Sequence, residues 1–320
     1  MTIRRLSTIV SVSALAVTLA ACNRGGADTT GSGDSPEAGD AAGQTITLAV
    51  STLNNPFFVD LRDGAQEAAD EAGVTLNVVD AQNDPATQAN QIADAVTQNV
   101  AAVVINPVDS DAAGSAVGPA NNADIPVVAV DRAVNGGDVA SLVSSDNVQG
   151  GELAAQTLAE AMGGSGEVLT LQGVPGTSAS RDRGEGFTQG IEGSGVTIAA
   201  SQPANFDRTE GLDVATNLLQ ANSGATGIFA ENDEMALGAI QALGARAGSE
   251  VMVFGFDGTD DGLKAVEGGQ MVGTIAQQPK ELGKVAIQTA IRTINGETVE
   301  AEIPVEVKVV TKDNVNEFLQ

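Results

Sequence analysis

Along most of the chain, short runs of hydrophobic residues alternate with longer stretches in which hydrophobic positions recur at helical spacing. The runs are rich in β-branched residues and occupy positions 46–51, 76–81, 101–106, 127–131, 167–172, 197–201, 227–230, 251–256 and 271–276. Runs of this length and composition are typical of buried strands. The pattern therefore predicts β-strands that alternate with amphipathic helices.

The stretch after the first run illustrates the helical spacing. Its hydrophobic stripe consists of Phe58, Leu61, Ala65, Ala68, Ala69 and Ala72. Gly73 follows, and glycine commonly ends a helix. Strands that alternate with helices of this length form parallel sheets with right-handed crossovers. Because the strands are too numerous for one compact sheet of ordinary size, we predict an α/β protein with two doubly wound, Rossmann-like lobes.

The beginning of the chain has a different pattern, typical of an export signal. Two arginines precede a mostly apolar run over 6–21, which is short for a membrane span. The run ends in the letters LAAC at 19–22, which resemble a bacterial lipobox, and Cys22 is the chain's single cysteine. We therefore predict a lipoprotein signal peptide over 1–22 with Cys22 as the lipidated residue. An ordinary secretory signal with a chance cysteine is the alternative.

The segment that follows is expected to be a tether. Residues 23–43 consist largely of Gly, Asp, Ser, Thr and Ala. Such a segment cannot bury enough apolar surface to offset the entropy lost on ordering. We expect it to connect a lipid anchor flexibly to a folded body that begins near Gln44. The body would then lie outside the cytoplasm, anchored to the cell membrane through lipid alone.

Composition excludes several kinds of chemistry. The 320 residues include 42 Asp plus Glu against 15 Lys plus Arg, for a formal net charge of −27, and no histidine. Without histidine there is no Ser-His-Asp or Cys-His catalysis and no imidazole metal site. A single cysteine excludes an internal disulfide framework and a thiolate zinc cluster. A chain this acidic would be repelled by phosphate backbones, and nucleic acid is therefore not expected as a partner. No cofactor or metal is expected either.

Side chains that bind hydroxyl groups follow many of the predicted strands. In open parallel sheets, ligands bind beyond the carboxyl ends of the strands. The residues at these positions are 51–58, Asn106, Asp131, Arg132, 173–183, Asn232, Asp233, Asp257 and Gln277, and Phe206 lies in the loop after another strand. Asp, Asn, Gln and Arg can pair with adjacent hydroxyls in fixed geometry, and phenyl rings suit the apolar C–H faces of a sugar. The set indicates a site for a polyhydroxylated ring.

Other roles are open for several of these residues. Asp131 and Asp257 could cap helices, because both come after strands. Asn106 precedes a proline and could belong to a turn. Phe57 and Phe58 could be core anchors of the first helix. A glycosidase carboxylate pair of Asp131 and Asp257 is a further alternative, although the arginine after Asp131 is expected to keep that carboxylate ionised.

A series of motifs, in order along the chain, resembles a known family. They are STLNNPFF (51–58), INP (105–107), DR (131–132), SDNV (145–148), GTS (176–178), RGEGF (183–187), FDR (206–208), NDEMALG (232–238), GFDGT (255–259) and TIAQ (274–277). From residue 46 to about residue 312, the chain resembles the D-ribose-binding proteins of bacterial ABC transporters, in the type I periplasmic-binding-protein superfamily. The resemblance implies that Phe57, Phe58 and Phe206 line the two faces of the sugar ring. It implies that the hydroxyls and ring oxygen of ribose are bound by Asn55, Asn106, Asp131, Arg132, Arg183, Asn232, Asp257 and Gln277.

The resemblance also implies a domain organisation and partners. Lobe one would take 44–145 plus 278–304, and lobe two 146–277 plus 305–320, joined by a three-strand hinge. Because both lobes would contribute binding residues, ligand would favour a closed form. The permease subunits of an ABC transporter would distinguish the closed form from the open one. The protein itself is expected to be a monomeric receptor and not an enzyme.

Several alternative functions differ in class. A receptor of the same fold could bind another monosaccharide, such as allose or a galactose-type sugar. A transcription regulator with this core is disfavoured by the export signal and by the lack of a basic helix-turn-helix segment. An enzyme, such as a sugar hydrolase or isomerase, is disfavoured because no general base or metal set can be named.

Overall fold

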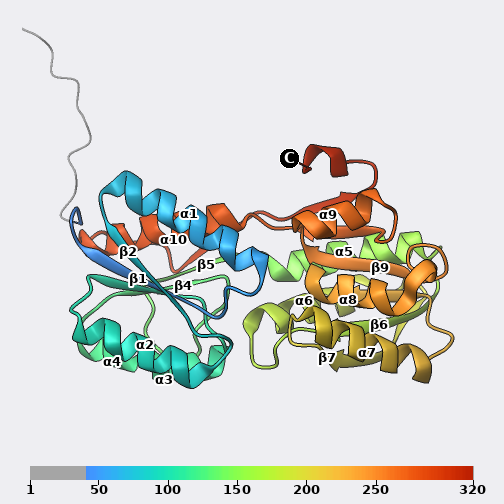
Figure 1. Ribbon diagram of the computed structural model, residues 1–320, viewed down its shortest axis with the longest axis horizontal. Coiled ribbons are helices and arrows are strands. Elements are labelled where there is room, and N and C mark those ends of the chain that lie inside the picture. The colour runs from blue at the N-terminus through green and yellow to red at the C-terminus, as the bar shows by residue number, and fades with distance from the viewer. Residues whose placement is uncertain (1–40, 320) are drawn as a thin grey trace, which may run out of the picture. The chain divides into compact units, whose positions relative to one another are not determined.

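The computed structural model describes residues 41–319, which form two six-stranded sheets (Figure 1). The first sheet contains β1 (Thr45–Val50), β2 (Thr75–Asp80), β3 (Ala102–Ile105), β4 (Val127–Val130), β5 (Ser141–Ser145) and β11 (Glu302–Val305). Their spatial order is β11-β5-β4-β3-β1-β2, and all neighbours are parallel. A parallel sheet needs a crossover between consecutive strands, and helices supply most of these crossovers here.

The second sheet repeats this arrangement. It contains β6 (Gly166–Gln172), β7 (Val196–Pro203), β8 (Gly227–Ala230), β9 (Met252–Asp257), β10 (Gly273–Ala276) and β12 (Lys308–Thr311). The order is β12-β10-β9-β8-β6-β7, and β12 pairs with β10 in the antiparallel sense. The two sheets confirm the predicted α/β fold with two lobes.

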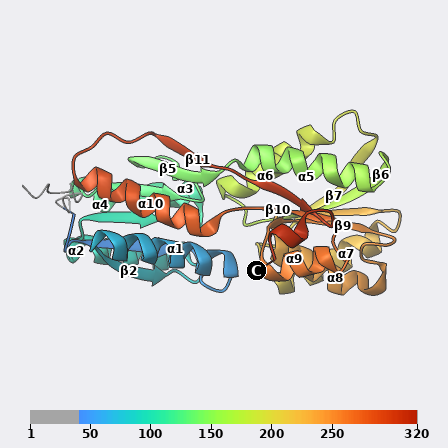
Figure 2. The same cartoon turned by 90° about the horizontal axis from the view of Figure 1, so that it is seen from above.

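Helices cover both faces of each sheet (Figures 1 and 2). On the first sheet, one face carries α1 (Pro56–Ala72) and α10 (Pro279–Ile294), and the other carries α2 (Pro85–Thr97), α3 (Ser110–Ala116) and α4 (Gly118–Asn122). On the second sheet, one face carries α5 (Asn147–Ala161) and α6 (Ser178–Gly190), and the other carries α7 (Arg208–Ala221), α8 (Asp233–Leu243) and α9 (Asp260–Glu267). Two short 3₁₀ helices occupy Gly244–Arg246 and Val315–Glu317.

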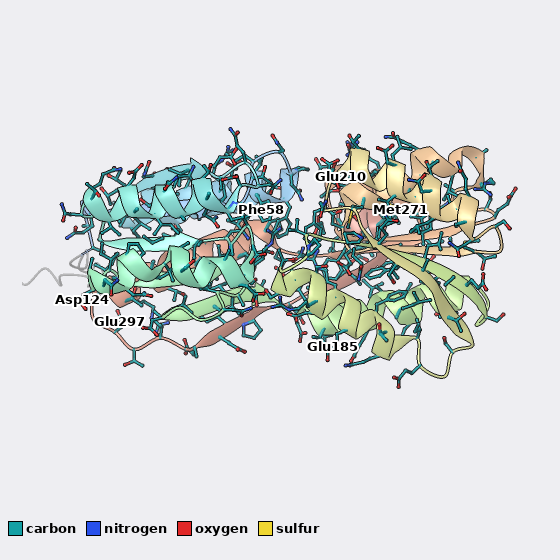
Figure 3. The ribbon with its side chains drawn as sticks, turned by 90° about the horizontal axis from the view of Figure 1, so that it is seen from below. Phe58, Asp124, Glu185, Glu210, Met271 and Glu297 are labelled. Carbon is teal, nitrogen blue, oxygen red and sulfur yellow. The ribbon has the colours of Figure 1, made fainter. Side chains whose placement is uncertain are left out.

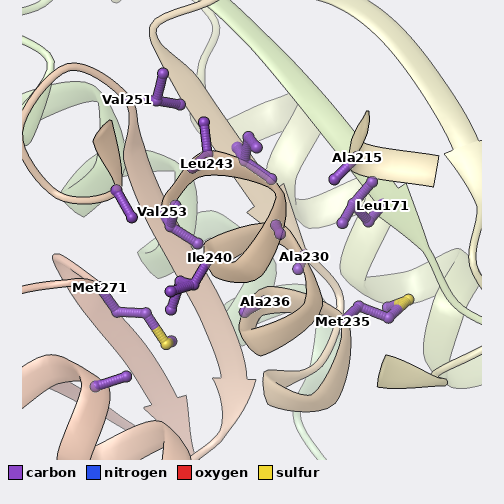
Figure 4. Close-up of a cluster of buried hydrophobic side chains, with 14 of the residues drawn as sticks. Leu171, Ala215, Ala230, Met235, Ala236, Ile240, Leu243, Val251, Val253 and Met271 are labelled. Atoms are coloured by element: carbon purple, nitrogen blue, oxygen red, sulfur yellow. The ribbon is translucent and has the colours of Figure 1, made fainter. Parts of the chain in front are cut away.

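Each sheet therefore has two hydrophobic cores, one on each face. Successive strand residues point to opposite faces, so Ile228 packs with α7 and α8 while its neighbour Phe229 packs with α5 and α6. Figure 4 shows the cluster beneath α8, in which Ile240 and Leu243 of the helix meet Val253 of β9. Burial on both faces explains why these strands read as continuous apolar runs.

The predicted helix after the first strand is confirmed as α1. Phe58, Leu61 and Ala65 are buried on its inner face, and Gly73 ends the helix in the left-handed conformation at φ 67°. Glycine adopts this conformation without the steric cost that a Cβ atom brings. Among residues 41–319, no helix is both long and apolar enough to cross a membrane.

Three strands lie outside the predicted hydrophobic runs, namely β5, β11 and β12. β5 has the sequence Ser-Leu-Val-Ser-Ser, with buried and half-buried positions in alternation. β11 and β12 are four residues each and carry charged side chains at exposed positions. Strands at the edge of a sheet need little apolar surface, so a search for apolar runs does not detect β11 and β12.

The chain passes between the two sheets three times. β5 of the first sheet leads into α5 on the second, and β10 of the second leads into α10 on the first. The last crossing connects β11 of the first sheet to β12 of the second. The crossings bring together strand ends that are far apart in the sequence.

Candidate functional site

A small cavity is lined by residues whose elements belong to both sheets. The lining residues are Asn55, Phe57, Phe58, Asp131, Arg132, Ala179, Arg183, Phe206, Asn232, Asp257 and Gln277. The structure thus brings together every binding residue implied by the resemblance except Asn106. Ala179, in the first turn of α6, was not a candidate because it carries no polar or aromatic group. Figure 3 shows Phe58 near the place where the two lobes meet.

Three of the polar residues lie at strand ends. Asp131 and Gln277 directly follow β4 and β10, and Asp257 is the last residue of β9. Asp257 and Gln277 end neighbouring parallel strands of the second sheet, so they lie at the same edge of that sheet, whereas Asp131 ends a strand of the first sheet. The cavity thus combines strand ends of both sheets, from residues more than a hundred positions apart in the chain.

Two of the asparagines also cap helices. Asn55 Oδ1 accepts a hydrogen bond of 2.9 Å from Phe57 N–H at the start of α1. Asn232 Oδ1 accepts one of 2.9 Å from Met235 N–H at the start of α8. An N-cap satisfies a free N–H of the first helical turn. Asn232 Nδ2 also donates to Phe206 O at 3.3 Å, so a ligand can be contacted by its second N–H and by the amide nitrogen of Asn55.

The capping role considered for Asp131 and Asp257 does not hold. α9, the helix after Asp257, is capped by Thr259, whose Oγ1 accepts from Gly262 N–H at 3.2 Å. Asp131 is followed by bends and β5, without a helix to cap. Both aspartates have positive φ, 66° and 122° respectively, which is uncommon for a residue with a Cβ atom. Residues held in such conformations cluster at functional sites.

Asn106 lies behind the cavity and is fully buried. Its Nδ2 donates to Asp131 Oδ2 at 3.0 Å and to Val130 O at 3.3 Å, while its Oδ1 accepts from Ser51 N–H at 3.1 Å. In this arrangement Asn106 orients the Asp131 carboxylate and does not itself line the cavity. The expected direct contact of Asn106 with a ligand stays a prediction.

The phenyl rings combine packing with exposure to the cavity. Phe57 and Phe58 are only 4% and 3% exposed and belong to the core under α1 and α10, with their rings edge to face at a centroid distance of 5.2 Å. The Arg132 guanidinium carbon lies 5.3 Å from the ring centroid of Phe58 and equally far from that of Phe206. The core role considered for Phe57 and Phe58 is therefore real, and it coexists with lining the cavity.

Arg183 connects the cavity to the framework of the second lobe. Its Nη1 lies 3.6 Å from Asp257 Oδ1 and donates to Glu231 O at 2.6 Å, and its Nε donates to Asn147 Oδ1 at 2.8 Å. Asp257 Oδ1 also accepts from Gln277 Nε2 at 2.8 Å. A guanidinium held by several acceptors loses little additional entropy when it binds a ligand.

Burial governs the ionisation of the acidic groups. Burial raises the pKa of Asp131, although the Arg132 and Arg183 guanidiniums and a hydrogen bond from Asn106 act to lower it. The expectation that Arg132 would keep Asp131 ionised is thus weakened, because burial outweighs the neighbouring charge. Burial also raises the pKa of Asp257 well above its usual range, opposed chiefly by Arg183. A ligand that supplies hydroxyl donors would stabilise the ionised form of both carboxylates.

Two polar atoms of the cavity residues are buried without a hydrogen-bond partner among the described residues. They are Gln277 Oε1, an acceptor, and Arg132 Nε, a donor that lies 3.5 Å from Asp131 Oδ2 as an ion pair without a hydrogen bond. An unpaired buried polar atom costs about 1–3 kcal/mol. A ligand that carries both donors and acceptors would pair with both atoms.

A larger cavity of about 560 Å³ lies in the second lobe, between α6 and the ends of β6 and β7, and none of the binding residues implied by the resemblance lines it. Glu231, directly after β8, borders it with a carboxyl group whose Oε2 accepts hydrogen bonds from Gly173 N–H at 2.7 Å and from Ser180 Oγ. Burial raises the pKa of Glu231 to about 7. The sequence did not identify Glu231, because it lies just before the NDEMALG motif and nothing in its neighbourhood distinguishes it from an exposed glutamate.

Comparisons with known proteins agree with this geometry. Residues 46–298 match the model of the periplasmic binding protein domain. The chain is 50% identical over 272 residues to the ribose import binding protein RbsB of Haemophilus influenzae, covering 85% of this chain and 93% of the relative. It is 32% identical over 263 residues to the D-allose-binding periplasmic protein of Escherichia coli, covering 78% and 84%.

A solved structure extends the comparison to the fold. An ABC transporter solute-binding protein of Mycobacterium smegmatis, with bound glycerol, superposes with a TM-score of 0.83 at 34% identity, covering 87% of this chain and 97% of that one. The relatives named here are binding proteins, of which two are named for import or for an ABC transporter. The match of the domain model, the identity to these relatives and the two-lobed fold together show that the chain belongs to the periplasmic binding protein family.

Proposed function

We propose that the protein binds D-ribose in the cavity between its lobes and delivers it to an ABC importer. The observation that carries the proposal is the lining of the cavity, where carboxylates, amides and guanidiniums surround phenyl rings and where Arg132 Nε and Gln277 Oε1 make no hydrogen bond. A pentose offers hydroxyls that both donate and accept, and apolar ring faces. The higher identity to a ribose import binding protein than to an allose-binding one favours ribose over allose.

The positions of the residues support a role for each. The Asp131 and Asp257 carboxylates would accept hydrogen bonds from neighbouring hydroxyls, and the Gln277 amide could accept or donate. Arg132 and Arg183 would donate hydrogen bonds to oxygens of the same sugar ring. Asn55 and Asn232 would donate from their amide nitrogens, because their oxygens cap helices. The rings of Phe57, Phe58 and Phe206 would pack against the two faces of the sugar.

A thermal-shift panel with ribose, allose, galactose, glucose and xylose tests the proposal. A ligand that binds only the folded state adds about 2.7 kcal/mol of stability at a hundredfold excess over Kd. Ribose is expected to raise Tm most, and glucose much less, because its additional hydroxymethyl group needs space that a pocket for a five-carbon ring does not provide. Equal shifts for ribose and glucose at matched concentrations would contradict the assignment. A larger shift with allose or galactose would replace ribose by that sugar.

We also propose lobe boundaries. Lobe one comprises 44–145 plus 278–304, and lobe two comprises 146–277 plus 305–320. The membership of β1 to β5 and β11 in one sheet, and of β6 to β10 and β12 in the other, supports this division. Permease subunits of the importer would contact both lobes of a monomeric receptor.

Membership of the family implies an extracytoplasmic location. We propose in addition that Cys22 carries a lipid anchor after removal of the signal peptide, with 23–43 as tether. Cys22 and most of the tether lie outside the described residues, and the proposal is supported by the LAAC letters at 19–22. A Cys22→Ala variant is expected to be released from membranes or left unprocessed. Fractionation with membranes as complete as that of the unchanged protein would contradict the anchor.

A further inference from the structure

Asp233 is a buried acidic residue that does not line the cavity. It is 0% exposed and begins α8, directly after Asn232. Its Oδ2 accepts hydrogen bonds from Thr259 N–H at 2.8 Å and from Thr259 Oγ1 at 3.0 Å, and its Oδ1 accepts one of 2.7 Å from Thr274 Oγ1. One carboxylate thus joins three elements: α8, the loop after β9, and β10.

The loop that Asp233 holds is the one that presents Asp257 to the cavity. Asp257 has φ 122° and Gly258 has φ 73°, so two consecutive residues adopt left-handed backbone. Such a conformation at a residue with a Cβ atom persists only where surrounding contacts enforce it. On one side Asp257 O accepts from Gln277 N–H at 2.9 Å, and on the other the N–H of Thr259 is bound by Asp233. Asp233 therefore secures the far end of the strained turn.

Glycines leave the space that this carboxylate occupies. A Cβ atom at Gly255 would lie 2.3 Å from Asp233 Oδ1, and one at Gly262 would lie 2.2 Å from Oδ2. A Cβ atom at Gly258 would lie 2.7 Å from Ala276 Cα, so the turn itself also packs closely on β10. The carboxylate is enclosed by backbone from both sides of the turn, which restricts its position and that of its partners.

The carboxylate also has an electrostatic cost for the site. Burial raises the pKa of Asp233 to about 6, and its charge adds to the effects that raise the pKa of Asp257. A second buried negative charge disfavours the ionised Asp257 that would bind hydroxyls. The hydrogen bonds that hold the turn offset this cost.

We propose that Asp233 is a positioning residue for the sugar site: through Thr259 and Thr274 it holds the turn at 257–259 so that the Asp257 carboxylate faces the cavity beside Gln277. The inference rests on the proposed function in that Asp257 is taken to bind the sugar. Asp233 itself touches no ligand in this arrangement. Its effect on affinity is therefore expected to depend on hydrogen bonding and not on its charge.

Two variants of Asp233 separate hydrogen bonding from charge. Asp233→Ala removes all three hydrogen bonds and is expected to weaken ribose binding at least about tenfold. Asp233→Asn keeps the shape, since its amide oxygen can accept from Thr259 N–H and its amide nitrogen can donate to Thr274 Oγ1. Asn is expected to restore affinity to within about threefold of the unchanged protein. Titration calorimetry at a temperature where every variant is fully folded measures these differences.

Ile240→Ala is the matched control for lost stability. Ile240 lies on the same helix and packs in the core beneath α8 (Figure 4), and it makes no hydrogen bond through its side chain. It is expected to lower Tm without changing affinity. Equal affinity of Asp233→Ala and Ile240→Ala would overturn the inference, and so would Asp233→Asn binding as weakly as Asp233→Ala. If Asp233→Ala does not fold, Thr274→Val replaces it, since it removes one donor to Asp233 with little change in volume, and at least a threefold weakening is then expected.

A measurement without sugar keeps this inference separate from the proposed function. The three-bond coupling between the amide and α protons of Asp257 depends on φ, and NMR measures it in the ligand-free protein. In Asp233→Ala, or in Thr274→Val, the coupling is expected to move toward values for extended backbone, whereas Asp233→Asn keeps it. An unchanged coupling in the alanine or valine variant would overturn the inference. Failure of the unchanged protein to bind ribose would contradict the proposed function alone.

Discussion

Asp257 combines an uncommon backbone conformation with a buried carboxylate that already accepts one hydrogen bond from Gln277. Hydrogen bonds to a charged group contribute about 1.5–3 kcal/mol each. Asp257→Ala would leave two sugar hydroxyls unpaired in a dry site, so we expect ribose affinity to fall at least about a hundredfold. Folding should be retained, because burial of this carboxyl disfavours its charged form. Calorimetric titration and a denaturation curve of the ligand-free protein measure the two effects.

Asp260→Ala is the control for this change, since it removes an exposed negative charge three residues away. It is expected to leave affinity within about twofold of the unchanged protein. Near-normal affinity of Asp257→Ala, together with lowered stability, would mean that Asp257 serves the fold and not the ligand.

Glu231 makes a separate prediction about pH. Its pKa is raised by burial from 4.5 to about 7, so between these values the folded state holds a proton that the unfolded state has lost. The free energy of unfolding must therefore fall as pH rises through this window, by at most about 3 kcal/mol from this group. Glu231→Gln is expected to flatten the dependence between pH 5 and 7.5, as measured by urea denaturation.

An exposed glutamate on α6, Glu185, provides the matched control (Figure 3). Glu185→Gln removes the same formal charge but should leave the slope of stability against pH as it is in the unchanged protein. This comparison separates the buried group from the general repulsion of a chain with net charge −27. An equally steep slope in Glu231→Gln would contradict the raised pKa.

At the scale of elements, α1 and α10 make their closest approach through two glycines. A Cβ atom at Gly64 would lie 2.0 Å from Lys280 O, and one at Gly283 would lie 2.0 Å from Leu61 O. Backbone cannot yield as a flexible side chain does, so Gly64→Ala is expected to cost about 1–3 kcal/mol of stability. The midpoint of urea denaturation measures this loss.

Gly118→Ala, at the start of α4, is the corresponding control. No atom lies within 4 Å of a Cβ atom at that position. It is expected to change stability by no more than about 0.5 kcal/mol, or to raise it, because alanine favours helices. If Gly64→Ala loses as little stability as Gly118→Ala, α1 and α10 can move apart without cost and their close backbone packing does not contribute to stability.

At the scale of the whole molecule, the division of the residues that line the cavity between two lobes has a mechanical consequence. Asp131 and Arg132 belong to the first lobe, and Arg183 and Asp257 to the second. A ligand that contacts all four stabilises only the form in which the lobes are close. Ribose is therefore expected to lower the radius of gyration measured by small-angle scattering. An unchanged radius, with binding confirmed by calorimetry, would contradict closure about the three crossings.

Much of the fold could be predicted because it depends on local patterns. Apolar runs with helical stretches between them predicted most strands of both sheets, and Gly73 marked the end of α1. β5 escaped because its alternating serines make no apolar run, and its place beside β4 depends on pairing with distant residues. Pairing partners are a property of the folded chain and leave little trace in a short polar segment.

The candidate residues depended on the rule that ligands bind at the carboxyl ends of parallel strands, and on the motifs that resemble the ribose-binding proteins. The rule identifies positions along the chain, but it does not say whether a side chain faces the cavity or lies behind a neighbouring side chain. It therefore did not separate Asn106, which lies behind Asp131, from the residues that line the cavity. Ala179 lies within 173–183, but its methyl group gave no reason to select it, although it lines the cavity.

The sequence by itself determined the alternation of strands and helices, the excluded chemistries and the set of polar and aromatic residues at the strand ends. The tertiary structure alone decided the environments of these residues. Glu231, Asn232 and Asp233 are consecutive polar residues, yet one borders the larger cavity, one lines the smaller cavity and one holds the turn of Asp257. Burial and hydrogen-bond partners decide these roles, and both depend on segments brought together from distant parts of the chain.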